Sequence, residues 1–420
     1  MTRPVIGTIG TRVALALANL LTVMAASHHL GAGGVGTISL IVLGITLVLL
    51  LNNVVGGSGL VYLTSRHGTH ALRWPAYGWA VITLAAALLL LHLLPLVPEA
   101  YIIHTAVLAF LQSICTIHLG LLLGRERIQA HNGLLVMQAV LLLGGFLWFL
   151  QHGAAEVMDH IRAGYLANGT TALLSGIISR DGRQADHPQR PTDVLRALFH
   201  QGGMAQAANG LQLVNYRFTY YIIEGQLGSS FLGIYAITTQ LAESTWLVPK
   251  SMGQVLYARV SNLRDQLAQR DLTLTALKAS TAIAVVAVGV LVLLPEAVYR
   301  TVFGGEITGL PPLLLLLAPG LIAMAASQAI SHYLSGTGHV RHNTIGSGIG
   351  TLFTVVLGLL LVPRMGLAGA AITASSAYTA SVLYQWVVFR RMTGLRALDL
   401  LPHAGDVDRL RSLWKNVLGR

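Results

Sequence analysis

The sequence of 420 residues is poor in charge and contains a single cysteine. Charged residues make up 10% of the chain and hydrophobic residues 54%, a balance that a soluble core does not require. The lone thiol, Cys115, excludes an internal disulfide and any metal site built from several cysteines. The chain is instead rich in glycine, with 45 residues, and small residues allow helix backbones to approach closely in membrane bundles. This composition predicts a membrane protein.

The apolar residues gather into runs long enough to cross a bilayer. A helix needs about 20 residues to span roughly 30 Å of hydrocarbon. The sequence contains twelve runs of that order. They are Val5–Ala26, Thr37–Leu63, Ala76–Leu94, Ile102–Leu123, Leu134–Leu150, Ile161–Ile178, Met204–Ile223, Phe231–Val255, Leu277–Leu294, Leu313–Leu334, Ile345–Val362 and Leu367–Phe389. Because unpaired backbone groups exclude open β structure in lipid, we predict an all-α membrane protein of about twelve transmembrane helices.

The two halves of the chain share a pattern of glycines. Three pairs have the same offset of 228 − 31 = 197 residues: Gly31 and Gly228, Gly36 and Gly233, and Gly56 and Gly253. The first two pairs stand in short segments between long apolar runs, so the repeated unit is a hairpin of spans. Six spans in each half predict two six-helix lobes related as a parallel internal repeat. Paired lobes of this kind indicate a protein that moves a substrate across a bilayer.

The predicted domains follow from this repeat. They are an N-terminal lobe over 1–178, a cytoplasmic linker over 179–197, a C-terminal lobe over 198–392 and a cytoplasmic amphipathic tail over 393–420. In the tail, apolar residues occupy one helix face and basic residues another, which is typical of a helix lying on the inner leaflet. The first external segment is expected to be a loop from Ser27 to Gly36.

Basic residues set the predicted orientation. With the N-terminus inside, three basic residues fall outside (Arg162, Arg300 and Arg364) and three within spans (Arg12, Arg217 and Lys250), which leaves 27 − 6 = 21 on the cytoplasmic side. Cytoplasmic loops retain lysine and arginine, so both termini are expected in the cytoplasm. The net charge of +11 then reflects topology and attraction to anionic membrane lipids, and nucleic acid is not expected as a partner.

Polar residues form a stripe along the first span of the second half. Six residues of this helix fall within an arc of about 100°: Gln206, Asn209, Tyr216, Arg217, Tyr220 and Glu224. A helix that faces lipid does not carry such a stripe. We therefore expect five of these residues, Glu224 excepted, to line a substrate cavity.

Matching polar positions occur elsewhere. The first span of the chain has Arg12 and Asn19 on one face, and the eighth has Glu243 and Lys250 seven residues apart. At the repeat offset, Lys250 corresponds to Asn53, whose neighbour is Asn52. A charge at membrane depth costs about 2.5–3.5 kcal/mol, so these residues predict a hydrated cationic cavity. Two simpler alternatives remain: Arg12 and Lys250 snorkel to the interface, or Glu243 is an ion-pair partner of Arg217 or Lys250.

Three segments resemble a known superfamily. Leu361–Tyr378, Gly228–Val260 and the turn Gly336–Gly338 are similar to the multidrug/oligosaccharidyl-lipid/polysaccharide (MOP) exporters, in particular to the Wzx-type polysaccharide flippases. The resemblance implies a V-shaped pair of six-helix lobes. It also implies transport of polyprenyl-pyrophosphate-linked oligosaccharide across the cytoplasmic inner membrane by a monomer, and leaves a polysaccharide polymerase or other assembly proteins open as partners. Arginine is well suited to the diphosphate of such a substrate.

Two alternatives remain open. A MATE-like drug/cation antiporter is the first, although acidic residues, which its cationic substrates favour, are absent from the first six predicted spans. A polyprenyl-dependent membrane glycosyltransferase is the second, but the first external segment has no carboxylate for metal or base chemistry. We predict a protein without enzymatic activity. We assign it no metal and no cofactor, because the His332, His339 and His342 cluster is expected by chance among 16 histidines.

Overall fold

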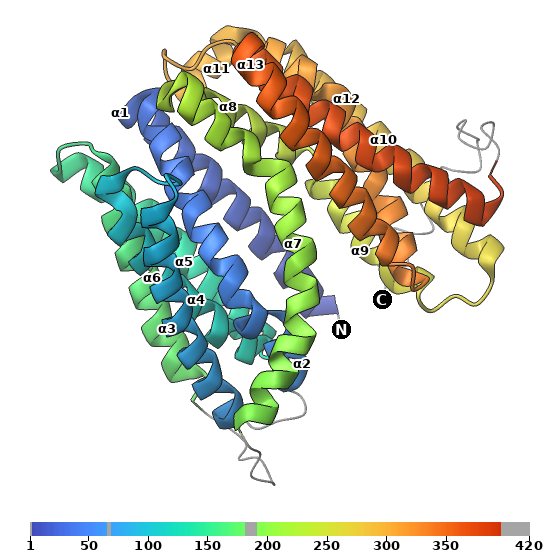
Figure 1. Ribbon diagram of the computed structural model, residues 1–420, viewed down its shortest axis with the longest axis horizontal. Coiled ribbons are helices and arrows are strands. Elements are labelled where there is room, and N and C mark those ends of the chain that lie inside the picture. The colour runs from blue at the N-terminus through green and yellow to red at the C-terminus, as the bar shows by residue number, and fades with distance from the viewer. Residues whose placement is uncertain (1, 65–68, 181–190, 396–420) are drawn as a thin grey trace. The chain divides into compact units, whose positions relative to one another are not determined.

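The computed structural model describes residues 2–64, 69–180 and 191–395, and all regular structure within these ranges is helical (Figure 1). The chain divides into two compact units, Met1–Gly210 and Leu211–Arg420. The helices that begin in the first unit are α1 (Thr2–Gly56), α2 (Ser58–Thr64), α3 (Thr69–Leu93), a 3-10 turn at Glu99–Tyr101, α4 (Ile102–Gly124), α5 (Ile128–His152), α6 (Val157–Ile178) and α7 (Pro191–Leu227). Those of the second are α8 (Ser229–Ser244), α9 (Leu247–Val260), α10 (Gln266–Leu293), α11 (Glu296–Phe303), α12 (Leu310–Gly336) and α13 (Arg341–Thr393).

Seven helices in the described ranges are long and apolar enough to cross a membrane by length and composition. Two of them, Gly10–Thr64 and Arg341–Thr393, have 55 and 53 residues, more than twice the roughly 20 that one crossing needs. Near the middle of each a glycine has non-helical angles, Gly31 in α1 and Gly366 in α13, so each holds two successive spans. The sixth, seventh and eighth predicted spans are less apolar and coincide with α6, α7 and the α8–α9 pair. Most of the polar residues described below lie on α7 and α8.

The glycine repeat of the sequence is visible in the backbone. Gly31 has φ 66° and ψ −172°, and Gly228, at the matching position before α8, has φ 90° and ψ 173°. These angles belong to a region that is open almost only to glycine. The turn at Gly31 takes one residue, so the segment Ser27–Gly36, expected to be a loop, is otherwise helical. A single glycine suffices because it reverses the chain without interrupting the helix on either side.

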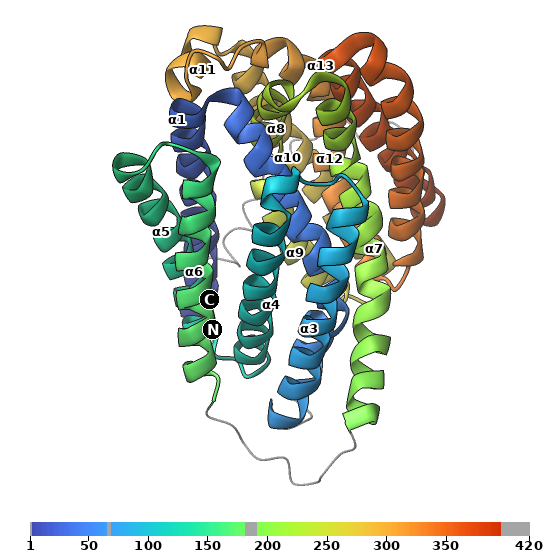
Figure 2. The same cartoon turned by 60° about the vertical axis from the view of Figure 1, so that its left-hand side comes forward.

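Each unit is built around its fourth span. In the first, α4 packs against α1, α2, α3, α5 and α6, and Figure 2 shows it between α6 and α3. In the second, α12 packs against α8, α9, α10, α11 and α13. The repeated glycines Gly56 and Gly253 lie at these contacts: a Cβ on Gly56 would come within 3.1 Å of Ile117 on α4, and one on Gly253 within 2.7 Å of His332 on α12. The two halves of the chain therefore share the contact of this glycine with the fourth span as well as its position in the sequence.

Two elements differ in detail from the predicted spans. The eighth span, expected to be continuous over Phe231–Val255, is divided into α8 and α9 by a turn at Thr245–Trp246. In addition, α7 begins at Pro191, inside the range expected for the linker, and the boundary between the units falls within this helix at Gly210. Residues 181–190 of the linker and 396–420 of the predicted tail lie outside the described residues.

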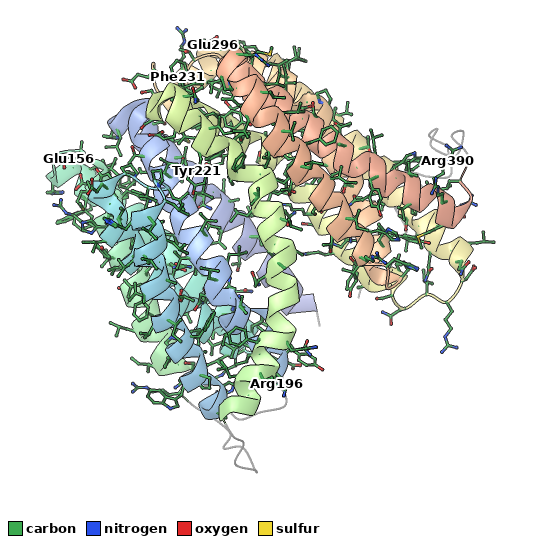
Figure 3. All side chains as sticks on the ribbon, in the orientation of Figure 1. Glu156, Arg196, Tyr221, Phe231, Glu296 and Arg390 are labelled. Carbon is green, nitrogen blue, oxygen red and sulfur yellow. The ribbon has the colours of Figure 1, made fainter. Side chains whose placement is uncertain are left out.

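The two ends of the second unit are distinguishable. Figure 3 shows Phe231, near the start of α8, and Glu296, at the start of α11, at one end of this unit, and Arg390, near the end of α13, at the other. The predicted topology assigns the first two residues to the external side and Arg390 to the cytoplasmic side. The arrangement agrees with the spans expected between them.

The positive φ angle of Gly228 leads to a stability prediction. Gly228 and Gly225 both have open space where a Cβ would stand, but only Gly228 has a positive φ. We expect Gly228→Ala to lower the free energy of unfolding by about 1–3 kcal/mol through backbone strain alone. Gly225→Ala, the matched control, should leave stability unchanged or raise it, since alanine is favoured in a helix. Thermal unfolding of the two purified variants in detergent measures the difference, and equal melting temperatures would contradict the prediction.

Candidate functional site

A bidentate ion pair joins α7 to α8 in the second unit. Arg217 Nη1 and Nη2 donate to Glu243 Oε1 and Oε2 at 2.5 and 2.9 Å. Both side chains are 25% exposed, so the pair is neither fully buried nor fully solvated. Bidentate arginine–carboxylate contacts are charge-assisted and directional. The pair also neutralises two charges that would each be unfavourable at membrane depth.

Aromatic side chains from three segments surround the pair: α7, the turn between α8 and α9, and α13. The rings of Tyr216, Trp246 and Tyr378 contact one another with centroid separations of 5.4–5.9 Å. The Arg217 guanidinium lies over the ring of Tyr220, 5.2 Å from its centroid, which is within the range of a cation–π contact. These four aromatic residues, together with Arg217 and Glu243, are called the Arg217–Glu243 site below.

Hydrogen bonds fix the walls of the Arg217–Glu243 site. The Trp246 indole N–H donates to the Leu321 carbonyl of α12 at 3.1 Å, which anchors the turn between α8 and α9. The Tyr220 hydroxyl lies 2.6 Å from Thr239 Oγ1 on α8. Trp246, Tyr378 and Tyr220 are 1%, 3% and 5% exposed, so they form a fixed surface and not a mobile one.

A proline and a glycine explain the close approach of α12 and α13 beside Trp246. Pro319 interrupts the hydrogen-bond pattern of α12, and the next N–H, that of Gly320, donates to Ser375 Oγ on α13 at 3.0 Å. A Cβ on Gly320 would lie 2.6 Å from the Ser375 Cα, so only glycine fits this contact. The contact holds the segment of α13 that carries Tyr378, three residues further along the helix.

Two exposed polar side chains adjoin the site. Lys250 on α9 is exposed, and its Nζ lies over the Trp246 ring at 5.7 Å from the centroid. Gln212 on α7 is also exposed and donates from Nε2 to the Tyr216 hydroxyl at 3.1 Å. The accessible part of the site therefore offers a cation, an amide and a phenol next to the ion pair.

The structure brings together five of the residues predicted to line a cavity: Tyr216, Arg217, Tyr220, Glu243 and Lys250. Glu224 lies apart from them on α7, where it accepts a hydrogen bond from Ser229 Oγ at 2.7 Å. The polar stripe of α7 thus ends in a local contact at the start of α8, one turn and more beyond Arg217.

The remaining predicted residues lie in the first unit. Gln206 and Asn209 on α7 contact each other, with Asn209 Nδ2 donating to Gln206 Oε1 at 3.2 Å. Arg12 and Asn19 are exposed on the first half of α1. Arg12 and Asn19 are thus exposed, and Gln206 and Asn209 contact each other, as expected for polar helix faces.

Asn52 and Asn53 occupy a different environment. Asn52 is 0% exposed, and neither polar atom of its side chain has a hydrogen-bond partner within the described residues. The Asn53 Oδ1 is likewise buried without a partner in this part of the chain. Asn52 packs against Gly56, where a Cβ would come within 2.9 Å of its Nδ2. Asn52 is therefore an interior side chain of the first unit.

Sequence reasoning missed Tyr378 and Thr239. Tyr378 falls within the segment Leu361–Tyr378 on which the superfamily resemblance rests, but no polar periodicity on α13 distinguishes it. Thr239 is one of several threonines on α8 and is identified only by its contact with Tyr220. No spacing rule connects residues 378 − 217 = 161 positions apart, so packing alone reveals Tyr378.

A second buried polar network, in the first unit, was also not predicted. His118 on α4 hydrogen-bonds to the Tyr77 hydroxyl through Nε2 and to Ser175 Oγ through Nδ1, at 2.9 Å in the second case. Nearby, Arg73 Nη2 donates to the Ser179 carbonyl at 2.6 Å. The network ties α3, α4 and α6 together near one end of the first unit.

Comparisons with known proteins give no match by sequence but clear matches by structure. The chain matches no protein-family model and no curated protein. An inward-facing multidrug resistance MATE family transporter of the MOP superfamily matches with TM-score 0.68 and 16% identity over 90% of this chain and 94% of the other. The MATE multidrug transporter DinF-BH matches with TM-score 0.69 and 14% identity over 93% and 95%. The inward closed lipid II flippase MurJ matches with TM-score 0.68 and 13% identity over 100% and 93%.

The chain has the MATE/MOP transporter fold. This fold confirms the predicted all-α membrane protein with about twelve helices in two lobes. These three structures are two MATE transporters and a lipid flippase, and each match extends over nearly the whole chain. Proteins with this fold therefore include multidrug transporters and a lipid II flippase, so the fold alone does not identify the substrate of this chain.

Proposed function

We propose that the chain is a transporter that flips a polyprenyl-pyrophosphate-linked oligosaccharide across the cytoplasmic inner membrane by alternating access, for polysaccharide biosynthesis. The observation that carries this proposal is the Arg217 guanidinium, held among Tyr216, Tyr220 and Trp246 at a predicted membrane depth. A guanidinium presents a planar fork to phosphate oxygens, and tyrosine hydroxyls can donate to or accept from sugar hydroxyls. The fold supports the proposal because it is shared with the lipid II flippase MurJ.

The exposed Lys250 adds to this support. Its ammonium group lies over the Trp246 ring of the same site, so a second cation is available there for the two phosphates of a diphosphate. Membrane lipids are the second proposed partner, since the lipid tail of the substrate stays in the bilayer. Both termini are proposed to face the cytoplasm, as the distribution of basic residues favours.

A drug/cation antiporter is the second candidate, and Glu243 favours it. A carboxylate close enough to interact electrostatically with Tyr216 and Tyr378 has the chemistry that binds an organic cation. The multidrug transporters among the similar structures share the fold. In this chain, however, the carboxylate is already paired with Arg217, so an organic cation would have to compete with an arginine at 2.5 Å.

A deletion strain distinguishes the two functions. We expect its lipid extract, analysed by mass spectrometry, to contain an accumulated polyprenyl-pyrophosphate-linked glycan that disappears when the wild-type gene is restored. The same strain should be as resistant to cationic dyes as its parent. Sensitivity to dyes with no lipid-linked glycan would reject the flippase proposal in favour of the antiporter.

A further inference from the structure

The fork of Arg217 is occupied. Both terminal nitrogens of its guanidinium donate to Glu243, and Nη1 also lies 3.4 Å from the Tyr216 carbonyl oxygen. One face of the guanidinium is covered by the Tyr220 ring. A phosphate that approaches this side chain therefore meets an arginine whose bidentate edge is already in use. An anion reaches that edge only when the carboxylate leaves.

The surroundings of Glu243 determine what happens when it leaves. The titratable groups around the pair come from four elements: Tyr216 and Tyr220 from α7, Tyr235 from α8, Lys250 from α9 and Tyr378 from α13, while α12 contributes the Leu321 carbonyl beside Trp246. Within the described part of the chain, Arg217 is the one cation recorded in an ion pair with Glu243. Lys250 instead lies over the Trp246 ring and is exposed. A carboxylate released among buried tyrosines loses its counter-charge.

We propose that Glu243 fills the fork of Arg217 in the empty transporter, that the diphosphate of the substrate displaces it, and that the released carboxyl group takes up one proton from water. This inference rests on the proposed function. A carboxylate that has lost its arginine and stands beside a bound diphosphate is disfavoured in its charged form by like-charge repulsion, and with only 25% of its side chain exposed it is incompletely hydrated, so it binds a proton. Substrate loading is thereby coupled to proton uptake, and substrate release to the return of Glu243 and loss of the proton.

The coupling fixes the direction of a pH effect. Since the complex holds one proton more than the empty protein, the affinity for diphosphate rises as pH falls, by up to about tenfold per pH unit. Glu243→Gln removes both the competing charge and the proton acceptor. This variant should bind diphosphate about tenfold tighter or better at neutral pH, and its affinity should follow pH only as far as the phosphate groups of the ligand themselves titrate.

Titration calorimetry on the purified full chain in detergent tests the inference with farnesyl diphosphate as the probe. Repeating the titration in two buffers of different ionisation enthalpy gives the number of protons taken up on binding. We expect about one proton more for the wild type than for Glu243→Gln. Glu296→Gln, which alters an exposed pair with Arg300 on α11, is the matched control and should behave as the wild type.

The outcomes separate this inference from the proposed function. If the wild type binds farnesyl diphosphate and Arg217→Gln does not, while Glu243→Gln matches the wild type in affinity and proton count, the function stands and the exchange is rejected. If the wild type and Glu243→Gln both fail to bind the probe, the diphosphate function itself is rejected. If Glu243→Gln does not fold, proton uptake by the wild type is measured as a function of pH instead. An uptake that the ionisation of farnesyl diphosphate alone accounts for would reject the exchange.

Discussion

Replacement of Arg217 by alanine is expected to reduce translocation of lipid-linked oligosaccharide by about a hundredfold or more. Truncating one member of a hydrogen-bonded charge contact costs about 2–5 kcal/mol, and about 2.7 kcal/mol corresponds to a factor of a hundred. The loss arises because an alanine side chain at this position would offer no donor to the diphosphate. A reconstituted assay, in which the headgroup of a labelled lipid-linked oligosaccharide becomes accessible on the opposite leaflet, measures the rate.

Two further variants show whether the fork geometry matters. Arg217→Lys keeps the charge but loses the two parallel hydrogen bonds, so we expect an intermediate rate. Arg300→Ala removes an arginine of the same pairing chemistry, since Arg300 donates to Glu296 at 3.0 Å, but in an exposed pair on α11. This control should transport at the wild-type rate. Wild-type rates for Arg217→Ala would remove this residue from substrate handling.

The sequence predicted the fold well because its strongest signals are physical requirements of a bilayer. Each apolar run must be long enough to cross, and a glycine with positive φ must stand where two spans meet, as at Gly31 and Gly228. The same reasoning could not predict that one residue would complete the turn at Gly31, nor that the eighth span would break at Thr245–Trp246. The hydropathy pattern predicts neither the one-residue turn nor the break, because the apolar residues continue on both sides of each.

The candidate site could be predicted only in part. Periodicity on α7 identified Arg217 with Tyr216 and Tyr220, because residues three and four apart share a helix face. Hydrogen bonding between helices is not encoded in that periodicity, so the pairing of Arg217 with Glu243 was an alternative and not a prediction. Asn52 shows that a polar residue in a predicted span need not face a cavity, because its side chain is packed in the interior and is 0% exposed.

A double-mutant cycle on Arg217 and Glu243 has the second largest expected effect. Arg217→Met leaves Glu243 without its cation, and Glu243→Leu leaves Arg217 without its anion. Breaking a fully buried pair costs about 3–5 kcal/mol. Because each side chain here is 25% exposed, we expect about 2–3 kcal/mol for each single change. The double change Arg217→Met with Glu243→Leu should recover most of that loss, since apolar pairs can replace buried ion pairs.

The cycle is measured by unfolding in detergent, and it also separates structure from function. Additive losses in the double variant would mean that the two side chains do not interact, contrary to their bidentate contact. A stable double variant that still fails to transport would show that the defect of Arg217→Ala arises from the missing guanidinium and not from a destabilised unit. A stable double variant that transports normally would mean that the pair is a structural contact between α7 and α8. The anion-binding role of Arg217 would then be wrong.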